Sequence, residues 1–493
     1  MNSAANAAGV ANLTRPELLV QQALIGGGWT GAEDGTVLDV TNPAGGARIG
    51  TIPACGAADT RKAIAAANAA LPAWRALPAG SRAVILERWH GLMLANIDDL
   101  ARIMTAEQGK PLAEAAGEIR YAATFIKWFA EEARRVGGHE VAAPTADRRI
   151  FVRKEPIGVC AAITPWNFPA AMITRKGAAA LAAGCTLVVK PSELTPYTAL
   201  ALGLLAQEAG MPAGVLNIVT GLPEGIGGEL TSSPIVRKLS FTGSTRVGAL
   251  LMSQCAGTIK KLSLELGGNA PLIVFDDADL DIAVEGAMAS KFRNAGQTCV
   301  CANRLLVQSG IHDAFVERLG AAVAALKVGD GTAPGTTIGP LINEAAAAKV
   351  ASHVADALGK GATIAASAET PDGFVQPVVL TGASEDMLLA EEETFGPVAP
   401  IFRFETEEEA LRIANATPFG LASYFFTSDM DRAWRVSEAL EFGMVGLNTG
   451  SLAMEVAPFG GVKQSGLGRE GGQEGIEEFL ETKAFHWAGL KAR

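Results

Sequence analysis

The chain has 493 residues, of which 49% are apolar and 19% are charged, and its formal net charge is −11. This length and apolar content suffice for the cores of two or three domains, which excludes an intrinsically disordered chain. The acidic balance leaves no basic stripe for a phosphate backbone, so we expect no nucleic-acid partner.

The N-terminal segment, MNSAANAAGVANLTRPELL, lacks the apolar stretch of a signal peptide and has a single arginine. No run of about eighteen apolar residues occurs anywhere, so we expect no membrane span. The six cysteines are scattered, and the five histidines show no ligand spacing. We therefore expect a cytoplasmic protein without a disulfide framework and without a metal site.

From residue 59 to residue 135, apolar residues recur at three- and four-residue spacing, which predicts helices that cover a sheet. The segments 148–159 and 481–493 carry strand-like residues flanked by charges and predict surface strands. Further apolar runs alternate with helix-like segments, which predicts a parallel, doubly wound sheet. These runs are residues 159–163, 186–189, 215–219, 238–242 and 262–266.

A second set of apolar runs follows and predicts another α/β half. Its members are residues 272–275, 305–308, 398–404, 423–427 and 444–448. The fold class is therefore α/β with two doubly wound, Rossmann-like halves, and the cleft between the halves is the natural place for an active site.

Residues 265–301 hold the candidate chemistry. Glu265 ends a strand-like run, and Cys299 lies in a polar loop between a predicted helix at 276–292 and the strand near residue 305. Reactive side chains are often placed in such loops. Each residue also has an ordinary interpretation, because an isolated cysteine is usually a small buried hydrophobe and a carboxylate at a strand end is usually solvated.

A turn after another predicted strand, FTGSTRVG at residues 241–248, can bind phosphate. It opens a helix whose N-terminal N–H groups suit a pyrophosphate, and Gly243 allows close backbone approach. The usual G-x-G-x-x-G dinucleotide motif is absent from the strand–helix junctions. Many βα turns also carry Gly and Ser, so this motif is weak by itself.

Two longer motifs resemble a known family. ELGGNAP at 265–271 and FRNAGQTC at 292–299 are similar to the paired signature of the aldehyde dehydrogenase superfamily, and KFRNAGQTCVCANR at 291–304 is similar to its succinate-semialdehyde dehydrogenase branch. The resemblance runs from about Leu24 to the end of the chain. It implies that Cys299 is the nucleophile, that Glu265 is the base for the hydrolytic water, and that both face one crevice.

The resemblance also assigns residues to the other parts of the site. It implies that Asn167, together with the Cys299 backbone N–H, stabilises the oxyanion. The implied coenzyme-binding residues are Trp166, Lys190, Glu193, Gly243, Ser244, Leu266, Glu393 and Phe395. A carboxylate at Glu193 accepts from a ribose 2′-hydroxyl and repels a 2′-phosphate, so we expect NAD to be preferred over NADP.

The resemblance implies that Arg175 and Arg293 hold a distal carboxylate of the substrate. Ordinary surface salt bridges are the alternative role of these arginines. The family commonly has a serine at the same carboxylate, where this chain has Ala453 or Met454. The expected substrate is succinate semialdehyde, and glutarate semialdehyde or a broader range of aldehydes remains open.

Related enzymes use a cysteine at the position of Cys301 to form a reversible disulfide with the nucleophile. Two extended residues span about 6.6 Å, near the upper limit for such a bridge, so the loop would have to bend. Cys301 is therefore a candidate redox partner of Cys299, with simple packing as the alternative.

The resemblance implies three domains and a homo-oligomer, either a dimer or a tetramer. The expected division is an NAD(P)-binding domain at 1–136 and 158–266, a catalytic domain at 267–470, and a small antiparallel oligomerisation sheet at 137–157 and 480–493. A cysteine esterase or hydrolase is the alternative from another class. Such an enzyme would not need Lys190, Glu193 or the turn at 241–248.

Overall fold

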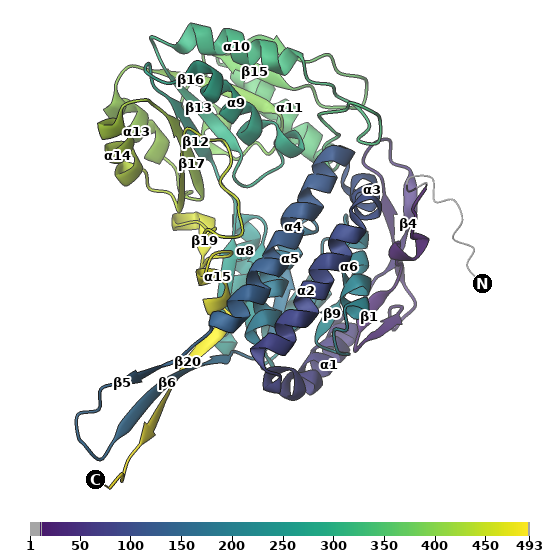
Figure 1. The fold of residues 1–493 in the computed structure, drawn as a ribbon. Coiled ribbons are helices and arrows are strands. Elements are labelled where there is room, and N and C mark those ends of the chain that lie inside the picture. Colours follow the sequence, from purple (N-terminus) through teal and green to yellow (C-terminus); the bar gives the residue numbers. More distant parts are fainter. Residues whose placement is uncertain (1–9, 11, 492–493) are drawn as a thin grey trace.

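The computed structural model describes residue 10 and residues 12–491. The first nine residues of the predicted coenzyme domain and the last two of the predicted oligomerisation segment lie outside this range. Figure 1 shows two lobes, one formed mainly by the first half of the chain and the other by residues coloured green, with a narrow sheet that projects away from both.

The first sheet has eight strands in the order β19-β11-β10-β7-β8-β9-β1-β2. Its five central strands are parallel, and β1, β2 and β19 join its two edges in antiparallel orientation. The central strands coincide with the five predicted runs. The strand bounds are β1 Ala23–Ile25, β2 Gly28–Thr30, β7 Val159–Ile163, β8 Thr186–Lys190, β9 Leu216–Ile218, β10 Val236–Thr242, β11 Lys261–Glu265 and β19 Gly466–Leu467.

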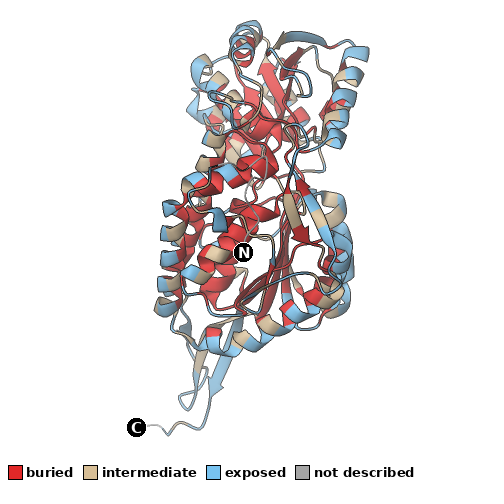
Figure 2. Cartoon of the chain, turned by 90° about the vertical axis from the view of Figure 1, so that its right-hand side faces the viewer, coloured by how far each residue is buried: buried red, intermediate tan, exposed pale blue. Residues whose placement is uncertain are grey.

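Helices cover this sheet, and their inward faces are buried (Figure 2). They are α1 Ala57–Ala76, α2 Ala79–Ala95, α3 Ile97–Gln108, α4 Leu112–Glu132, α5 Ala171–Ala183, α6 Pro196–Glu208, α7 Pro223–Ser232 and α8 Thr245–Cys255. Gly109 ends α3 at φ +92°, and a Cβ there would lie 2.7 Å from the Pro340 ring, so only glycine allows this turn beside the other lobe.

The second sheet has seven strands in the order β14-β15-β16-β13-β12-β17-β18, all parallel except the β14–β15 pair. Its strands are β12 Ala270–Val274, β13 Ala302–Gln308, β14 Thr363–Ser367, β15 Val378–Thr381, β16 Val398–Phe404, β17 Ala422–Phe426 and β18 Met444–Leu447. Its helices are α9 Leu280–Lys291, α10 His312–Ala324, α11 Glu344–Gly359, α12 Leu388–Glu391, α13 Glu407–Asn415 and α14 Met430–Ala439. Two doubly wound halves were predicted, and this fold class is confirmed.

The projecting sheet has the order β20-β6-β5 and is antiparallel. Its strands are β5 His139–Val141, β6 Arg149–Pro156 and β20 Leu480–Trp487, and most of its side chains are exposed. The predicted small antiparallel sheet is therefore present. The exact domain limits stay a prediction, and β19 joins the first sheet because Leu467 pairs with Leu264 at its edge.

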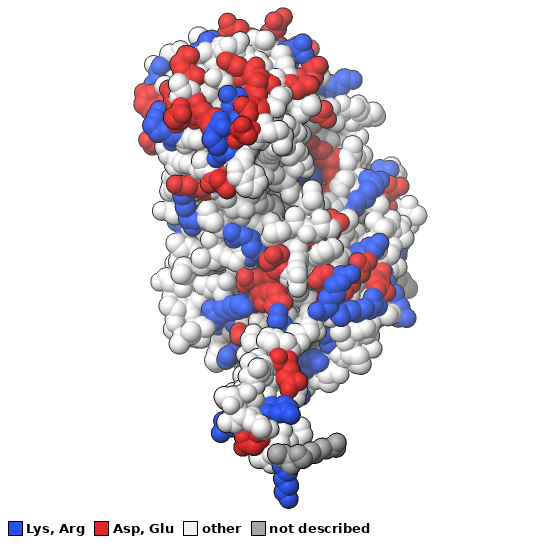
Figure 3. Space-filling model, turned by 60° about the vertical axis from the view of Figure 1, so that its left-hand side comes forward, with Lys and Arg blue, Asp and Glu red and all other residues white. Residues whose placement is uncertain are grey.

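The two remaining strands, β3 Val37–Thr41 and β4 Arg48–Pro53, form a separate hairpin, and the short helix α15 Glu474–Glu477 precedes β20. On the face drawn in Figure 3, basic and acidic side chains are interspersed. Among the described residues, no helix combines the length and the apolar character that a membrane crossing requires.

Candidate active site

A cavity of about 310 Å³ lies where the carboxyl ends of the first sheet's strands meet the second lobe. Ligands of open α/β sheets bind at this end of the strands. The wall is mainly apolar and draws on both lobes. Its residues are Pro165, Trp166, Asn167, Phe168, Met172, Thr242, Gly243, Ser244, Leu266, Gly267, Cys299, Ala346, Lys349, Glu393, Thr394 and Phe395.

Cys299 enters this cavity from the loop between α9 and β13. Asn294 and Ala295 in this loop both have left-handed backbone conformations, with φ of 51° and 55°. Glu114 Oε2 accepts from the Asn294 backbone N–H at 3.0 Å and fixes the loop. Such conformations are costly for residues other than glycine and persist where the surroundings enforce them.

The Cys299 thiol is less acidic than an ordinary cysteine. Its pKa is raised to about 12, chiefly by burial; Arg175 lowers the pKa, and Glu393 and Glu265 raise it. The thiol is therefore protonated at neutral pH.

Glu265 is the last residue of β11 and is only 3% exposed. Neither carboxylate oxygen makes a hydrogen bond with a described residue. Burial, followed by the negative charge of Glu470, raises its pKa well above the ordinary value. Its neighbours Leu266 and Gly267 line the cavity, but Glu265 does not. Cys299 and Glu265 therefore lie in the same region, but in this conformation only Cys299 lines the cavity.

The two glycines after Glu265 allow the second lobe to approach closely. A Cβ on Gly268 would lie 2.4 Å from the Cys299 carbonyl oxygen. The Gly268 backbone N–H donates to Glu393 Oε1 at 3.2 Å. The connection between β11 and β12 therefore holds the cysteine loop and the Glu393 segment together.

Asn167 lines the same cavity as Cys299, in the loop after β7. Its Nδ2 donates to the Gln297 carbonyl at 3.0 Å, and its Oδ1 accepts from the Phe168 backbone N–H at 3.1 Å. These two bonds fix the orientation of the amide and use one of its two N–H groups. The other N–H remains for a ligand.

The turn after β10 contributes Gly243 and Ser244 to the wall. Ser244 is the N-cap of α8, and its hydroxyl accepts from the Val247 backbone N–H at 3.4 Å. The free backbone N–H groups at the N-terminus of α8 therefore lie beside the cavity, where they can donate to an anionic ligand.

Glu393 and Phe395 line the opposite side. Burial raises the pKa of Glu393 to about 7. Phe395 has a left-handed backbone with φ of 57°, and its ring meets the Trp166 ring edge-on at 5.7 Å between centroids. An apolar wall with few polar groups suits a flat aromatic ligand.

Lys190 is the last residue of β8 and Glu193 follows in the next loop; neither is part of this wall. The Lys190 ammonium is 2.6 Å from Glu193 Oε2. Lys190 is buried, whereas about a third of the Glu193 side chain is exposed (32%). The second carboxylate oxygen is therefore free to accept from a ligand hydroxyl.

The two predicted substrate arginines differ in their surroundings. Arg175 on α5 is buried, and its Nη2 lies 2.8 Å from Glu470 Oε2 without hydrogen-bond geometry. Its guanidinium stacks on the Phe459 ring at 3.8 Å from the centroid. The adjacent Lys176 lies 2.5 Å from the other oxygen of Glu470. Arg175 thus shares the Glu470 carboxylate with Lys176. It lines neither the Cys299 cavity nor the cavity at Arg293 described below.

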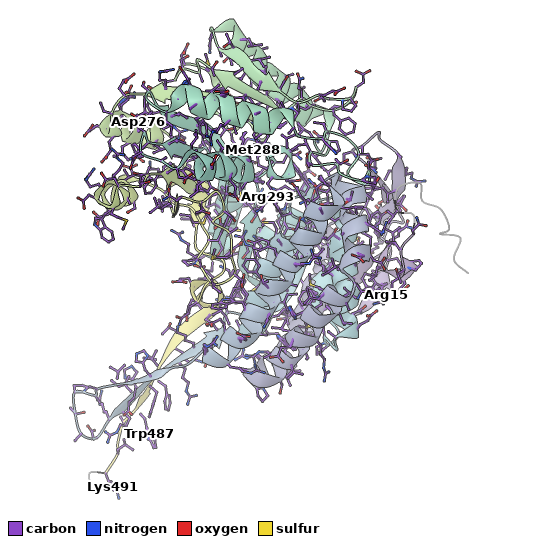
Figure 4. All side chains as sticks on the ribbon, turned by 45° about the horizontal axis from the view of Figure 1, so that its top comes forward. Arg15, Asp276, Met288, Arg293, Trp487 and Lys491 are labelled. Carbon is purple, nitrogen blue, oxygen red and sulfur yellow. The ribbon has the colours of Figure 1, made fainter. Side chains whose placement is uncertain are left out.

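Arg293 lies at the end of α9, where the second lobe meets α4 (Figure 4). It lines a second cavity of about 280 Å³, together with Lys110, Glu114, Gly117, Glu118, Tyr121 and Phe168. Its guanidinium is 4.8 Å from the centroid of Phe168, whose ring also lines the Cys299 cavity. Among the described carboxylates, none forms an ion pair with Arg293.

Cys301 turns toward α9, where Lys291 Nζ donates to its sulfur at 3.4 Å. The Cys301 backbone N–H donates to the Thr298 carbonyl at 3.1 Å, so the chain turns at residues 298–301. The bridge to Cys299 stays a prediction, because both thiols are free in this structure.

The motifs did not indicate several charged residues around the site, of which Lys110 and Glu470 are buried and Lys349 is exposed. Lys110 donates to the Asn167 carbonyl at 2.8 Å, and Lys349 donates to the Glu393 carbonyl at 2.6 Å. Glu470 forms ion pairs with both Arg175 and Lys176. Their partners are far away in the sequence, so no local pattern shows these contacts.

A cavity with a thiol, an oriented amide and a phosphate-type turn defines a thiol-dependent, nucleotide-binding enzyme. The model of the aldehyde dehydrogenase family matches residues 29–485. The chain belongs to the aldehyde dehydrogenase family.

Individual relatives cover almost the whole chain. The succinate-semialdehyde dehydrogenase [NADP(+)] GabD of Escherichia coli is 60% identical over 96% of this chain and 98% of the relative. The glutarate-semialdehyde dehydrogenase of Pseudomonas putida is 61% identical over 95% and 98%. The crystal structure of succinate-semialdehyde dehydrogenase from Burkholderia pseudomallei is 61% identical, with a TM-score of 0.96 over 97% of this chain and 100% of that chain. The predicted resemblance is therefore confirmed.

Proposed function

We propose that this aldehyde dehydrogenase oxidises an ω-carboxylated semialdehyde, with succinate semialdehyde as the foremost candidate and succinate as product. The observation that carries the proposal is Arg293. This guanidinium has no carboxylate partner among the described residues and lines a cavity that adjoins the Cys299 cavity through the Phe168 ring. An external carboxylate supplies the missing partner and leaves the aldehyde end directed to the thiol.

In the proposed reaction, the Cys299 thiol releases its proton to solvent and its sulfur forms a bond to the aldehyde carbon. The carbonyl oxygen becomes an oxyanion, which accepts from the free N–H of Asn167 and from the Cys299 backbone N–H. A nicotinamide coenzyme held at Gly243 and Ser244 would supply the acceptor for the hydride of this carbon. Hydrolysis of the Cys299 thioester would then release the acid and restore the thiol.

Glu265 is proposed to take the proton from the hydrolytic water. Both of its oxygens are without hydrogen bonds to described residues, so no bond has to break when the side chain turns toward Cys299. Its raised pKa makes the ionised carboxylate a stronger base than an exposed glutamate.

We propose that the coenzyme lies along Gly243, Ser244 and the cavity wall, with its adenosine ribose at Lys190 and Glu193. The residues fit such a ligand, since the turn ends at a helix N-terminus and Trp166, Leu266 and Phe395 offer an apolar surface. The carboxylate of Glu193 favours NAD over NADP by repelling a 2′-phosphate. The relative in Escherichia coli is named for NADP, so this preference depends on the Glu193 argument alone.

The test is a matrix of kcat/KM values for succinate semialdehyde, glutarate semialdehyde and uncharged aldehydes of equal length, each with NAD and NADP. We expect the carboxylated aldehydes to exceed the uncharged ones by about tenfold or more, as one charge-assisted hydrogen bond predicts. Equal values for both kinds would contradict the substrate proposal, and a tenfold preference for NADP would contradict the coenzyme proposal. Cofactor-free ester hydrolysis without aldehyde oxidation would indicate a hydrolase.

Glutarate semialdehyde is the second candidate, and a specific feature favours it. Ala453, not Met454, lines a small cavity beside Arg293, so the position that commonly carries serine holds a smaller, apolar side chain. An alanine in place of serine removes one oxygen atom from this wall, which favours a longer aliphatic chain. The Pseudomonas putida relative named for this substrate is consistent with that reading.

We also propose a homo-oligomer in a reducing, cytoplasmic setting. The projecting sheet ends in two open edge strands, β5 and β20, whose backbone groups a second copy can pair. The six cysteines are free thiols, which is consistent with a reducing compartment.

A further inference from the structure

Helix α11 packs directly against the segment that carries Glu393 and Phe395 to the active-site cavity. Lys349 on this helix donates to the Glu393 carbonyl at 2.6 Å. A Cβ on Gly396 would lie 2.3 Å from a methyl group of Val350, which is also on α11. The position of this segment in the cavity wall therefore depends on its contacts with α11.

His353, one turn after Lys349 on α11, is a fully buried histidine that faces this segment. Its Nδ1 lies 3.2 Å from the Thr394 hydroxyl, and its Nε2 lies 3.4 Å from Glu392 Oε2. These two partners are the residues on either side of Glu393. The ring therefore contacts both flanks of a residue that lines the cavity.

The partners of His353 determine which ring nitrogen carries the proton. Burial lowers the pKa of His353, and the positive charge of Lys349 acts in the same direction, whereas Glu392 and Asp356 raise it. The ring is therefore neutral at pH 7, with one donor and one acceptor. Because a carboxylate only accepts, Nε2 donates to Glu392, and Nδ1 is left to accept from the Thr394 hydroxyl.

Thr394 is buried and lines the cavity. Its backbone N–H donates to Asn303 Oδ1 at 3.3 Å, and its hydroxyl makes no hydrogen bond with a described residue other than His353. The next residue, Phe395, has a left-handed backbone with φ of 57°. Such a conformation persists where surrounding contacts enforce it, and the bond between His353 and Thr394 is one of these contacts.

We propose that His353 is a positioning residue for the coenzyme: by accepting from the Thr394 hydroxyl, it holds Glu393 and Phe395 in the orientation that binds the nicotinamide end. This inference rests on the proposed function, which places the coenzyme along this wall. His353 does not line the cavity and acts through Thr394. Without the bond, the segment would adopt the binding conformation for only part of the time, and the apparent affinity for coenzyme would fall by that fraction.

Two amide variants of the full-length enzyme separate the two contacts of the ring. His353→Asn keeps an oxygen that can accept from Thr394, whereas His353→Gln keeps an N–H that can donate to Glu392. Isothermal titration calorimetry measures the dissociation constant of NAD. We expect it to rise about 5- to 20-fold in His353→Gln and less than about threefold in His353→Asn, since the lost hydrogen bond has about this value. KM for the aldehyde should change less than about twofold in both.

Thr394→Val removes the same bond from the other side. In this background there is no hydroxyl for position 353 to hold, so His353→Asn and His353→Gln should bind NAD equally. Heat unfolding of each variant without coenzyme is the control for a merely structural role. A histidine that only supports the fold would lower the melting temperature and leave the NAD affinity of the folded protein unchanged.

An unchanged NAD dissociation constant in His353→Gln, or an equal rise in His353→Asn, would overturn the role of His353 and leave the proposed function intact. If the His353 variants do not fold, an unchanged dissociation constant in Thr394→Val overturns the inference. If the unmodified enzyme binds neither NAD nor NADP, the proposed function fails and the inference with it.

Discussion

At the scale of single residues, burial disfavours the charged form of the two groups that the proposed reaction uses. It raises the pKa of the Cys299 thiol to about 12 and the pKa of the Glu265 carboxyl well above its ordinary value. Charged groups are costly to bury, so the Cys299 thiol stays protonated at neutral pH. This arrangement protects the thiol from unwanted electrophiles, which react with thiolates.

The raised pKa of Cys299 predicts the pH dependence of its alkylation. Without coenzyme or substrate, the rate of reaction with iodoacetamide should rise about tenfold per pH unit between pH 7 and 10, because the thiolate fraction keeps growing below a pKa of about 12. Mass spectrometry of the Cys299 peptide measures the rate, with a small free thiol as control. A rate that levels off between pH 9 and 10, as for an ordinary cysteine, would contradict the burial argument.

At the scale of elements, an ion-pair cluster ties α5 to the C-terminal segment that follows β19. Glu470 contacts Arg175 and Lys176, and Lys176 also donates to the Thr242 hydroxyl at the end of β10. All three charged side chains are buried. Removing the one carboxylate would leave two buried cations unpaired, which is more costly than the pair itself is stabilising.

Glu470→Gln should therefore lower the free energy of unfolding by about 3 kcal/mol. Denaturant titration measures the change. The control is Glu477→Gln, whose ion pair with Lys154 is partly exposed and should contribute less than about 1 kcal/mol. Equal changes in the two variants would show that the buried cluster has no special role in stability.

The elements also show where sequence patterns are sufficient. The central strands of both sheets are mainly apolar runs of three to seven residues, so their positions follow from local patterning. The edge strand β19 has only two residues, and its pairing with β11 depends on the folded chain. The family motifs indicated Cys299, Asn167 and Glu265. They did not indicate Glu470, since its partners lie far away in the sequence.

Arg175 illustrates the same limit within the site. Its position in the motif predicts a contact with the substrate carboxylate, but the structure surrounds it with Phe459 and Glu470. Glu470 competes with a substrate carboxylate for Arg175, but it is almost three hundred residues away in the sequence. Its contact with Lys176 likewise spans 294 residues, so no local pattern shows it. Burial and charge balance appear only in three dimensions.

At the scale of the whole molecule, the sheet β20-β6-β5 projects away from both lobes, and most of its side chains are exposed. Phe485 and Trp487 on β20 are 44% and 53% exposed, and Trp487 extends from the end of this sheet (Figure 4). A thin sheet with open edges and exposed aromatic residues is typical of an interface. A second copy of the chain is the proposed partner.

Trp487→Asp should therefore reduce the oligomer to smaller species, because it places a charge in the proposed interface. Light scattering coupled to size-exclusion chromatography measures the mass. Trp434→Asp is the matched control, since Trp434 is 68% exposed on α14 in the other lobe. An unchanged mass for Trp487→Asp, or an equal effect of the control, would contradict the interface.

The central proposal is that Cys299 carries the acyl group and Glu265 activates the water that releases it. The most direct measurement is intact-protein mass spectrometry of Glu265→Gln after mixing with succinate semialdehyde and NAD, with reduced coenzyme followed in the same reaction. The account predicts about one equivalent of reduced coenzyme per site and an acyl adduct on Cys299 that persists. Steady turnover at the original rate, or an adduct that survives Cys299→Ala in the same background, would contradict it.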